Sequence, residues 1–220
     1  MARHIATKSV VDAVTDDVRG RILSGELTAD TAVTELEIAT AYNVARPTAK
    51  AAIEKLVAES LLVRGAHKSA RVATLGPDSV RDIYLARAYL ESEILRRLAA
   101  SRTVPQEAVR ANAELLAMAG AGDLALVEPD MRFHTALVDA VGNERTTRMY
   151  RSLVSEVRLC MTRVQSLHLL DSAAIHGEHE QILRYLAAGD ADAAAATLDT
   201  HLATARERLA AAVDGAGNNG

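Results

Sequence analysis

Apolar residues recur at helical spacing through the first 60 residues of the chain. The first periodic segment covers residues 9–24 and is followed by a glycine, a common stop signal for a helix. Thr34 and Glu37 have the spacing of a capping box, so a second helix begins there. A third helix carries Pro47 in its first turn, where proline is tolerated, and ends near Ser60. This pattern predicts three consecutive helices.

Two short apolar runs follow the third helix. Residues 61–64 and 70–73 are predicted strands, and residues 65–69 between them form a turn. Two helices, a short turn, a helix and a two-stranded hairpin are arranged in the order of a winged helix-turn-helix. We therefore predict such a domain, with its small β-hairpin, over residues 1–75.

The remainder of the chain has no strand-like alternation. Glycine, proline, asparagine and aspartate separate a series of apolar-periodic segments. The predicted helices cover roughly residues 78–101, 105–119, 123–141, 144–166, 171–188 and 190–213. Gly189 and Asp190 have the chemistry of a C-cap followed by an N-cap, so the last two helices should fold back antiparallel. The sequence thus predicts a mainly α protein with an all-α antiparallel bundle over 78–213 and a disordered tail at 214–220.

The composition is that of a globular chain, with 49% hydrophobic and 25% charged residues. The single cysteine, Cys160, excludes an internal disulfide and favours a reducing compartment. No segment has the roughly 18 uninterrupted apolar residues of a membrane span, and the N-terminal residues lack a signal-peptide pattern. These features predict a cytoplasmic protein that does not interact with membranes.

The net charge of −4 is unevenly distributed. Residues 1–75 carry ten Lys/Arg and nine Asp/Glu, a net charge of +1, whereas the remaining residues carry fifteen and twenty, a net charge of −5. The difference has the sign expected for a DNA-binding domain joined to an acidic regulatory domain.

The third predicted helix begins with two cationic side chains on one face. Arg46 and Lys50 are four residues apart, and Thr48 lies near them at the N-terminal end of the helix. Docking in a major groove needs cations for phosphates and for guanine edges. His67 and Lys68, at the hairpin tip, are placed to reach the DNA backbone or the minor groove. The residues alone leave ordinary solvated charges as an alternative interpretation.

Residues 11–72 resemble the DNA-binding head of GntR-family regulators. Residues 22–27 (Ile-Leu-Ser-Gly-Glu-Leu) match the end of the family's opening helix well. The second helix matches at Val33, Glu35, Glu37, Ile38 and Ala39. The third helix keeps Val44, Arg46 and Ala52, and Lys50 stands where the family usually has a second arginine. The resemblance implies that Arg46, Thr48 and Lys50 contact operator DNA.

Histidines and an aspartate recur in the helical body. Asp130 and His134 are four residues apart and project from one helix face, while His179 and His201 lie on two later helices. Side chains on facing helices can converge on one ion in a bundle core. Imidazole and carboxylate ligands suit zinc, with nickel and manganese as alternatives. A purely structural ion, or no ion and ordinary buried histidines, are the other interpretations that the residues allow.

The body from Val80 to Leu209 resembles the FCD ligand-binding domain of the FadR subfamily of GntR regulators. The resemblance rests on five stretches of the sequence: Arg87 to Glu91, Asp130-Met-Arg-Phe-His134, Gly142-Asn143, Glu178-His179 and Gly189-Asp190 through His201-Leu202. The resemblance implies that Asp130, His134, His179 and His201 bind a divalent metal ion. It also implies a small organic acid as effector, with its carboxylate at the metal and the rest held by Arg87, Asn143 or Arg158.

The function predicted from these observations is a ligand-responsive transcription repressor. A homodimer would place two recognition helices on palindromic operator DNA, and effector binding would lower operator affinity. We expect no enzymatic activity. The alternative is a metal-dependent hydrolase with an appended helix-turn-helix, but the chain has no H-E-x-x-H motif and no nucleophile elbow.

Overall fold

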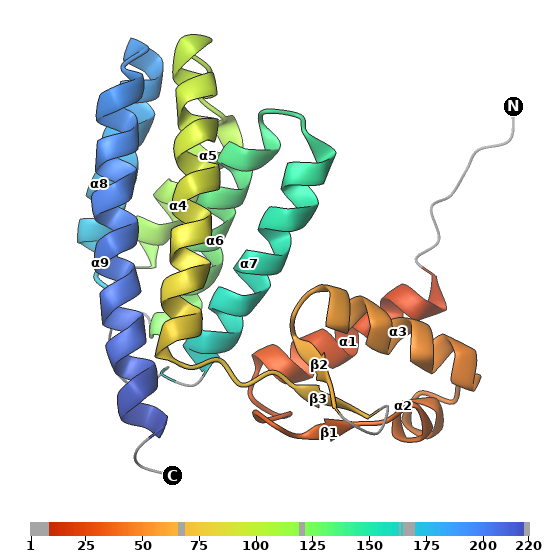
Figure 1. Ribbon diagram of the computed structural model, residues 1–220. Coiled ribbons are helices and arrows are strands. Elements are labelled where there is room, and N and C mark those ends of the chain that lie inside the picture. The colour runs from red at the N-terminus through yellow and green to blue at the C-terminus, as the bar shows by residue number, and fades with distance from the viewer. Residues whose placement is uncertain (1–8, 66–68, 119–121, 163, 165–169, 218–220) are drawn as a thin grey trace, which may run out of the picture. The chain divides into compact units, whose positions relative to one another are not determined.

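The computed structural model describes residues 9–65, 69–118, 122–162, 164 and 170–217. The chain separates into two compact units, Met1–Thr74 and Leu75–Gly220 (Figure 1). Each unit has its own buried core. The predicted fold class, a winged helix-turn-helix followed by an all-helical domain, is confirmed.

The first unit combines three helices with a small antiparallel sheet. Its elements are α1 (Val10–Leu23), β1 (Ala32–Val33), α2 (Glu35–Ala41), α3 (Arg46–Ala58), β2 (Leu62–Arg64) and β3 (Ala70–Val72). The strand order is β1-β3-β2, with Val63 opposite Arg71 and Val33 opposite Ala70. The sequence pattern did not predict β1, because two residues are too few for an alternation to be recognised.

Local signals in the sequence set the helix boundaries of this unit. The hydroxyl of Ser9 accepts a hydrogen bond from the backbone N–H of Asp12 and caps α1. Thr34 and Glu37 form the expected capping box at the start of α2. Asn43 adopts a left-handed φ of 50°, which separates α2 from α3.

The second unit is built from six helices. They are α4 (Pro77–Ala100), α5 (Gln106–Ala117), α6 (Asp123–Asp139), α7 (Glu144–Thr162), α8 (Ser172–Ala188) and α9 (Ala191–Gly217). The residues that form its apolar core come mainly from α4, α6, α7 and α9. Gly189 ends α8 in a left-handed conformation with φ of 80°, and Asp190 caps α9, so that α8 and α9 lie side by side (Figure 1).

The last helix is longer than the sequence predicts. We expected it to end at residue 213 and a disordered tail to begin at 214, but α9 continues to Gly217. Ala212 and Val213 are buried, so packing against the core supports the helix up to its last turn. No helix in the described part of the chain is long and apolar enough to cross a membrane.

Candidate metal centre and nucleic-acid interface

Four side chains from three helices converge in the core of the second unit. Asp130 and His134 come from α6, His179 from α8 and His201 from α9, and each is buried. Each residue offers one ligand atom, and these atoms all lie within 4.8 Å of one another. The structure therefore brings together the four residues that the sequence analysis named as metal ligands.

Two carboxylates orient the imidazole rings of this cluster. Nδ1 of His134 lies 2.5 Å from Oε2 of Glu91, and Nδ1 of His201 lies 2.6 Å from Oε2 of Glu178. Since an ionised carboxylate only accepts, both Nδ1 atoms carry the proton and both Nε2 atoms present a lone pair. The two Nε2 atoms face each other at 3.2 Å. Two lone pairs at this distance repel, and a cation between them removes the repulsion.

The buried environment keeps His134 and His179 in the neutral form that binds metals. Burial lowers the pKa of His134 against the opposing effect of Glu91. Burial, followed by the neighbouring His201 and His134, lowers the pKa of His179 well below its usual value. Neutral imidazole is the ligand form, so the site does not have to release a proton from these rings before an ion binds.

Several buried polar atoms at this site lack hydrogen-bond partners. Within the described residues, Oδ1 of Asp130 and both ring nitrogens of His179 have none, although Nε2 of His179 lies 3.4 Å from Oδ1 of Asp130. Buried polar atoms are normally satisfied. Zinc bonds of 2.0–2.1 Å in a tetrahedral site require ligand atoms about 3.4 Å apart, close to the 3.2 and 3.4 Å separations observed here. The residues present therefore fit a divalent metal ion.

The only phenylalanine of the chain holds one of the histidine rings. Phe133 stacks on His179 with ring centroids 3.6 Å apart and an interplanar angle of 5°. The stacking restricts the ring orientation of His179, whose Nδ1 has no hydrogen-bond partner in the described part of the chain. Phe133 therefore fixes the orientation of the His179 ring, as Glu91 and Glu178 fix the rings of His134 and His201.

Glu91 connects the cluster of Asp130 and the three histidines to a buried polar network. It accepts hydrogen bonds from Nε of Arg87 at 3.0 Å and from the hydroxyl of Tyr150 at 2.7 Å. Burial opposes its ionisation, but attraction to His134 and Arg87 outweighs burial and lowers the pKa of Glu91 to about 2. Sequence reasoning noted Glu91 and Glu178 only as parts of motifs. Their spacing, one turn after Arg87 and next to His179, was the available signal for a role at the site.

A cavity of about 70 Å³ opens beside the cluster. Its lining includes Asp130, Glu178 and His201, together with two arginines, Arg87 and Arg208. Arg87 is 1% exposed, and its Nη2 has no hydrogen-bond partner among the described residues. Arg208 is exposed and forms no ion pair with any other residue that the structure describes. Both guanidinium groups can therefore accept an anion.

Two of the predicted effector residues lie elsewhere. Oδ1 of Asn143 accepts hydrogen bonds from the backbone N–H groups of Arg145 and Thr146 and caps the start of α7. Arg158 pairs with Glu128 at 2.8 Å. Neither residue lines the cavity that contains Arg87. The sequence could not separate these local structural roles from ligand binding.

The first turn of α3 presents the cationic residues predicted to contact DNA. Arg46 and Lys50 are exposed, and Thr48 is half-buried. Arg46 and Lys50 form no ion pair within the described residues. The other described cations of this unit all pair with carboxylates: Arg19, Arg21, Lys55, Arg64 and Arg71. His67 and Lys68, predicted at the hairpin tip, lie outside the described residues.

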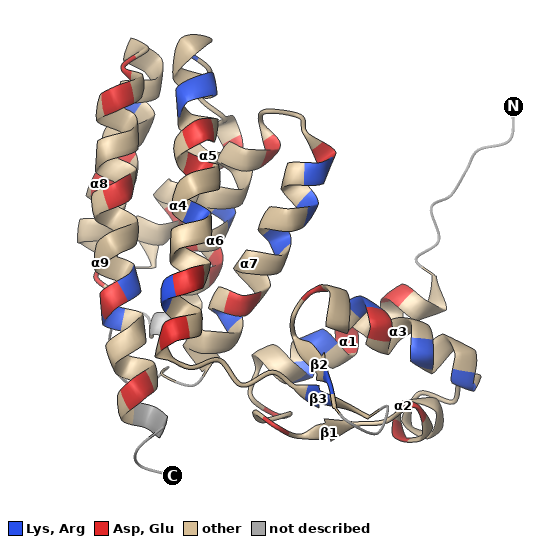
Figure 2. Ribbon diagram, in the orientation of Figure 1, with Lys and Arg blue, Asp and Glu red and all other residues tan. Residues whose placement is uncertain are grey.

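The N-terminus of α3 is open to an anion. Its N-cap residue, Ala45, makes no side-chain cap, and its first turn contains no acidic residue. The α2 helix differs, because Thr34 caps it and Glu35 and Glu37 occupy its first turn. Uncapped N–H groups and the helix dipole favour phosphate at such an end. Figure 2 shows the basic residues of α3 along the helix.

A winged helix-turn-helix joined to a helical domain with a buried Asp/His cluster defines a ligand-responsive DNA-binding transcriptional regulator. Residues 10–72 match the model of the gntR family of bacterial regulatory proteins, and residues 82–204 match the FCD domain. The chain belongs to the GntR family, with the FCD architecture that fits its FadR subfamily. The family resemblance inferred from the sequence is thereby confirmed.

Known relatives agree with this assignment. The chain is 27% identical over 160 residues to the Nta operon transcriptional regulator of Aminobacter aminovorans. The matched region covers 67% of this chain and 76% of the relative. A GntR transcriptional regulator from Rhodococcus sp. RHA1 has a similar structure, with a TM-score of 0.73, 23% identity, and coverage of 90% and 96%. McbR/YncC of E. coli gives a TM-score of 0.72 at 17% identity, with coverage of 92% and 98%. Both structures share the fold of this chain.

Proposed function

We propose that this protein is a repressor that leaves its operator when a small organic acid binds at a metal-containing cavity. Residues 1–75 form the DNA-binding domain, and residues 78–213 form the effector-binding and dimerisation domain. One observation carries the proposal: the buried cluster of Asp130 and three histidines borders a cavity that is also lined by Arg87, whose buried Nη2 has no hydrogen-bond partner among the described residues. Metal ligands and a buried cation together suit an anionic ligand.

Zinc is the proposed ion, with nickel or manganese as alternatives. Asp130, His134, His179 and His201 would supply three neutral nitrogens and one carboxylate oxygen, a donor set common for zinc. Bound there, the ion would supply a positive, Lewis-acidic centre that attracts the carboxylate of an effector. Glu91 and Glu178 hold the two rings in the tautomer that this requires.

The proposed effector is a small carboxylate. Since one water needs about 10–15 Å³ of such space, a cavity of about 70 Å³ accommodates only a few heavy atoms beyond the ion. Arg87 binds the acid from the buried side and Arg208 from the exposed side. Arg208 replaces Asn143 and Arg158 in this assignment, because the latter two are engaged in other contacts.

The proposed DNA-bound form is a homodimer. Its two α3 helices would enter successive major grooves about 34 Å apart, with Arg46, Thr48 and Lys50 at each half-site. Effector binding would favour a state of the dimer with lower operator affinity, and the effect on the two affinities is reciprocal.

The test is a gel shift with DNA from the region flanking the gene for this chain, repeated with a panel of small mono-, di- and tricarboxylates. We expect a sequence-preferring, salt-sensitive complex that one acid weakens about 5- to 150-fold in the metal-loaded protein. The same acid should have no effect after chelator treatment. A complex without sequence preference, or one insensitive to every acid of the panel, contradicts the proposal.

A catalytic role is not part of this proposal. Among the described cavity residues, the proposal gives the two carboxylates other roles: Asp130 is a proposed metal ligand, and Glu178 is hydrogen-bonded to His201. Neither carboxylate is free to act as a general base. Assays of the metal-loaded protein on ester and phosphoester substrates should therefore give only background rates.

A further inference from the structure

Glu91 divides its two carboxylate oxygens between a proposed metal ligand and a proposed anion-binding arginine. Its Oε2 lies 2.5 Å from Nδ1 of His134, which belongs to the metal cluster. Its Oε1 accepts hydrogen bonds from Nε of Arg87 and from the hydroxyl of Tyr150. All four side chains are buried, so bulk water does not compete for these contacts. Each contact of Glu91 therefore affects the others.

A comparison within the chain shows which contact Arg87 lacks. Nε and Nη2 lie on the same edge of a guanidinium group, and this edge can bind the two oxygens of one carboxylate as a fork. Arg19 forms this fork with Glu59, and both of its hydrogen bonds are 2.7 Å long. Arg87 forms only the Nε half, and its Nη2 has no hydrogen-bond partner among the described residues. The missing half is a hydrogen bond to Oε2 of Glu91, the oxygen that His134 occupies.

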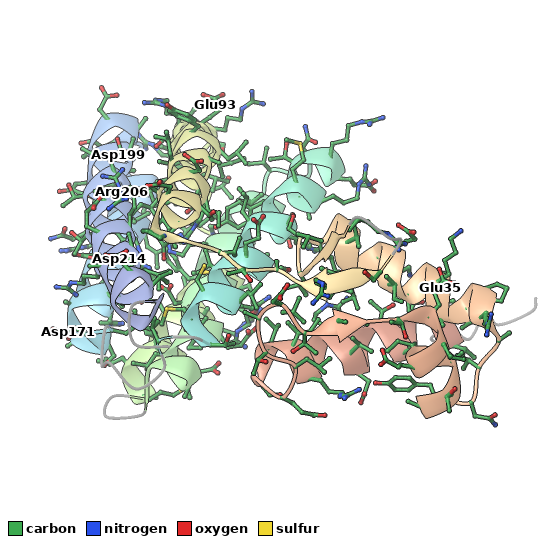
Figure 3. The ribbon with its side chains drawn as sticks, turned by 60° about the horizontal axis from the view of Figure 1, so that its bottom comes forward. Glu35, Glu93, Asp171, Asp199, Arg206 and Asp214 are labelled. Atoms are coloured by element: carbon green, nitrogen blue, oxygen red, sulfur yellow. The ribbon has the colours of Figure 1, made fainter. Side chains whose placement is uncertain are left out.

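Burial makes this missing hydrogen bond costly. Arg97 also donates to a carboxylate of α4 through Nε, 2.9 Å from Glu93, but both side chains are more than half exposed and water can satisfy their other atoms. Figure 3 shows Glu93 at the surface of α4. Arg87 is instead buried, and its guanidinium lies over the ring of Tyr84, 4.9 Å from the ring centroid. A buried guanidinium nitrogen without an acceptor is suited to bind an anion that enters the adjacent cavity.

We propose that Glu91 is a positioning residue for the anion site: the hydrogen bond from His134 holds Oε2 away from Arg87 and keeps Nη2 free for a small carboxylate. When this hydrogen bond is lost, Oε2 pairs with Nη2, the fork closes, and the anion loses its buried donor. A metal-binding Nε2 of His134 requires the proton on Nδ1, where Glu91 accepts it, so metal and anion binding favour each other even without direct contact. The inference rests on the anion-binding cavity of the proposed function and assigns its regulation.

The test measures acetate binding to the chelator-treated full chain at constant ionic strength, so that no metal ion contributes. Side-chain NMR signals of ¹⁵N-labelled arginine follow the titration. His134→Leu removes the donor to Oε2 and should weaken acetate binding at least about tenfold, the usual loss for one hydrogen bond to a charged group. His134→Asn also lacks the metal-binding Nε2 but keeps an N–H at the position of Nδ1. It should therefore bind acetate as tightly as the wild type does.

Two further measurements separate this role from a general loss of structure. His179→Leu removes another proposed metal ligand, whose ring nitrogens make no hydrogen bond within the described residues, and should bind acetate as the wild type does. In a crystal structure of His134→Leu, Oε2 of Glu91 should lie within about 3 Å of Nη2 of Arg87, whereas in His134→Asn the two atoms should stay apart. Circular dichroism checks folding, and His134→Met, with a more adaptable apolar side chain, replaces His134→Leu should the latter not fold.

Equal acetate affinities of His134→Leu and the wild type, or an open fork in the His134→Leu structure, overturn the inference. A wild type that binds no acetate, or His134→Asn and His179→Leu variants that bind it as weakly as His134→Leu, overturn it as well. The titration contains no DNA, so an operator complex that ignores every acid, alongside the expected acetate affinities, would refute the proposed function alone. An acid-sensitive operator complex alongside equal affinities of the two His134 variants would refute this inference alone.

Discussion

The Nε2 atoms of His134 and His201 face each other at 3.2 Å in the core of the second unit. The far nitrogen of each ring is held by a carboxylate, Glu91 for His134 and Glu178 for His201. This arrangement directs two lone pairs at one point, together with Asp130 and His179. The stability of the unit should consequently depend on a cation.

Removal of the ion should therefore lower the melting temperature. Binding to the folded state alone stabilises it by about 4 kcal/mol when the free ion exceeds its Kd about 1,000-fold. For a chain of this size, that corresponds to roughly 8–16 °C in Tm. Thermal melts with and without chelator, alongside elemental analysis for one ion per chain, test this expectation.

The control for the loss of a metal ligand is a histidine that lies outside the cluster, His176 of α8. His134→Ala should abolish both the bound metal and the chelator effect. His176→Ala should change neither, because His176 contacts the backbone of Asn112 instead of the cluster. A metal-free protein whose melting ignores chelator would eliminate the proposed site.

Glu178→Gln should weaken metal binding without unfolding the protein. The side chain of Glu178 is 35% exposed and contributes to the site through Nδ1 of His201. Loss of such an outer carboxylate typically costs 10–100-fold in metal affinity, and a chelator competition titration would measure it. Glu180→Gln, on the exposed side of α8, should leave the affinity at the wild-type value. Equal affinities for the two variants would show that Glu178 does not position the ligand.

Two Arg–Glu pairs of α4 with the same spacing should differ greatly in their contribution to stability. Arg87 and Glu91 are 3.0 Å apart with both side chains 1% exposed, whereas Arg97 and Glu93 are 2.9 Å apart with exposures of 64% and 55%. Arg87→Met leaves a buried carboxylate without its cation and should cost about 3–5 kcal/mol. Arg97→Met should cost less than about 0.5 kcal/mol. Chemical denaturation of chelator-treated protein would compare them, and similar losses would contradict this account.

Arg46→Ala combined with Lys50→Ala should weaken operator binding at least tenfold, since each lost contact to DNA costs about 1–3 kcal/mol. If both contact phosphates, the slope of log affinity against log salt should fall by roughly 2. Lys55→Ala is the matched control on α3, because Lys55 is paired with Asp12. Unchanged operator affinity in the double variant would mean that the first turn of α3 does not read DNA.

The carboxylate-binding role of Arg208 has a direct test as well. Arg208→Gln should reduce the thermal stabilisation by the acid found in the gel-shift panel, and the fold should be retained because the side chain is exposed. Arg184→Gln, an exposed arginine of α8 outside the cavity lining, should respond to the acid as the wild type does. Arg158→Gln should also respond normally, since Arg158 is engaged by Glu128. A normal response of Arg208→Gln would remove it from the site.

The sequence by itself determined the elements and the chemical inventory of this protein. Helix periodicity, the capping box of Thr34 and Glu37, and the Gly189-Asp190 boundary are local signals between residues a few positions apart, and the structure bears them out. The spacing of Asp130 and His134 also placed both side chains on one helix face. Such features depend on backbone geometry within one or two turns, so they can be recognised from the sequence without knowledge of the tertiary structure.

Tertiary structure alone decided what these parts contact. The two-residue strand β1 exists because β3 pairs with it, and no pattern within Ala32–Val33 indicates that partner. Asn143 caps a helix and Arg208 lines the cavity, although the family resemblance had implied Asn143 as one of the ligand-binding residues. Convergence of side chains from α6, α8 and α9 depends on how helices distant in sequence pack together. Packing is a cooperative, long-range property, and local spacing carries no information about it.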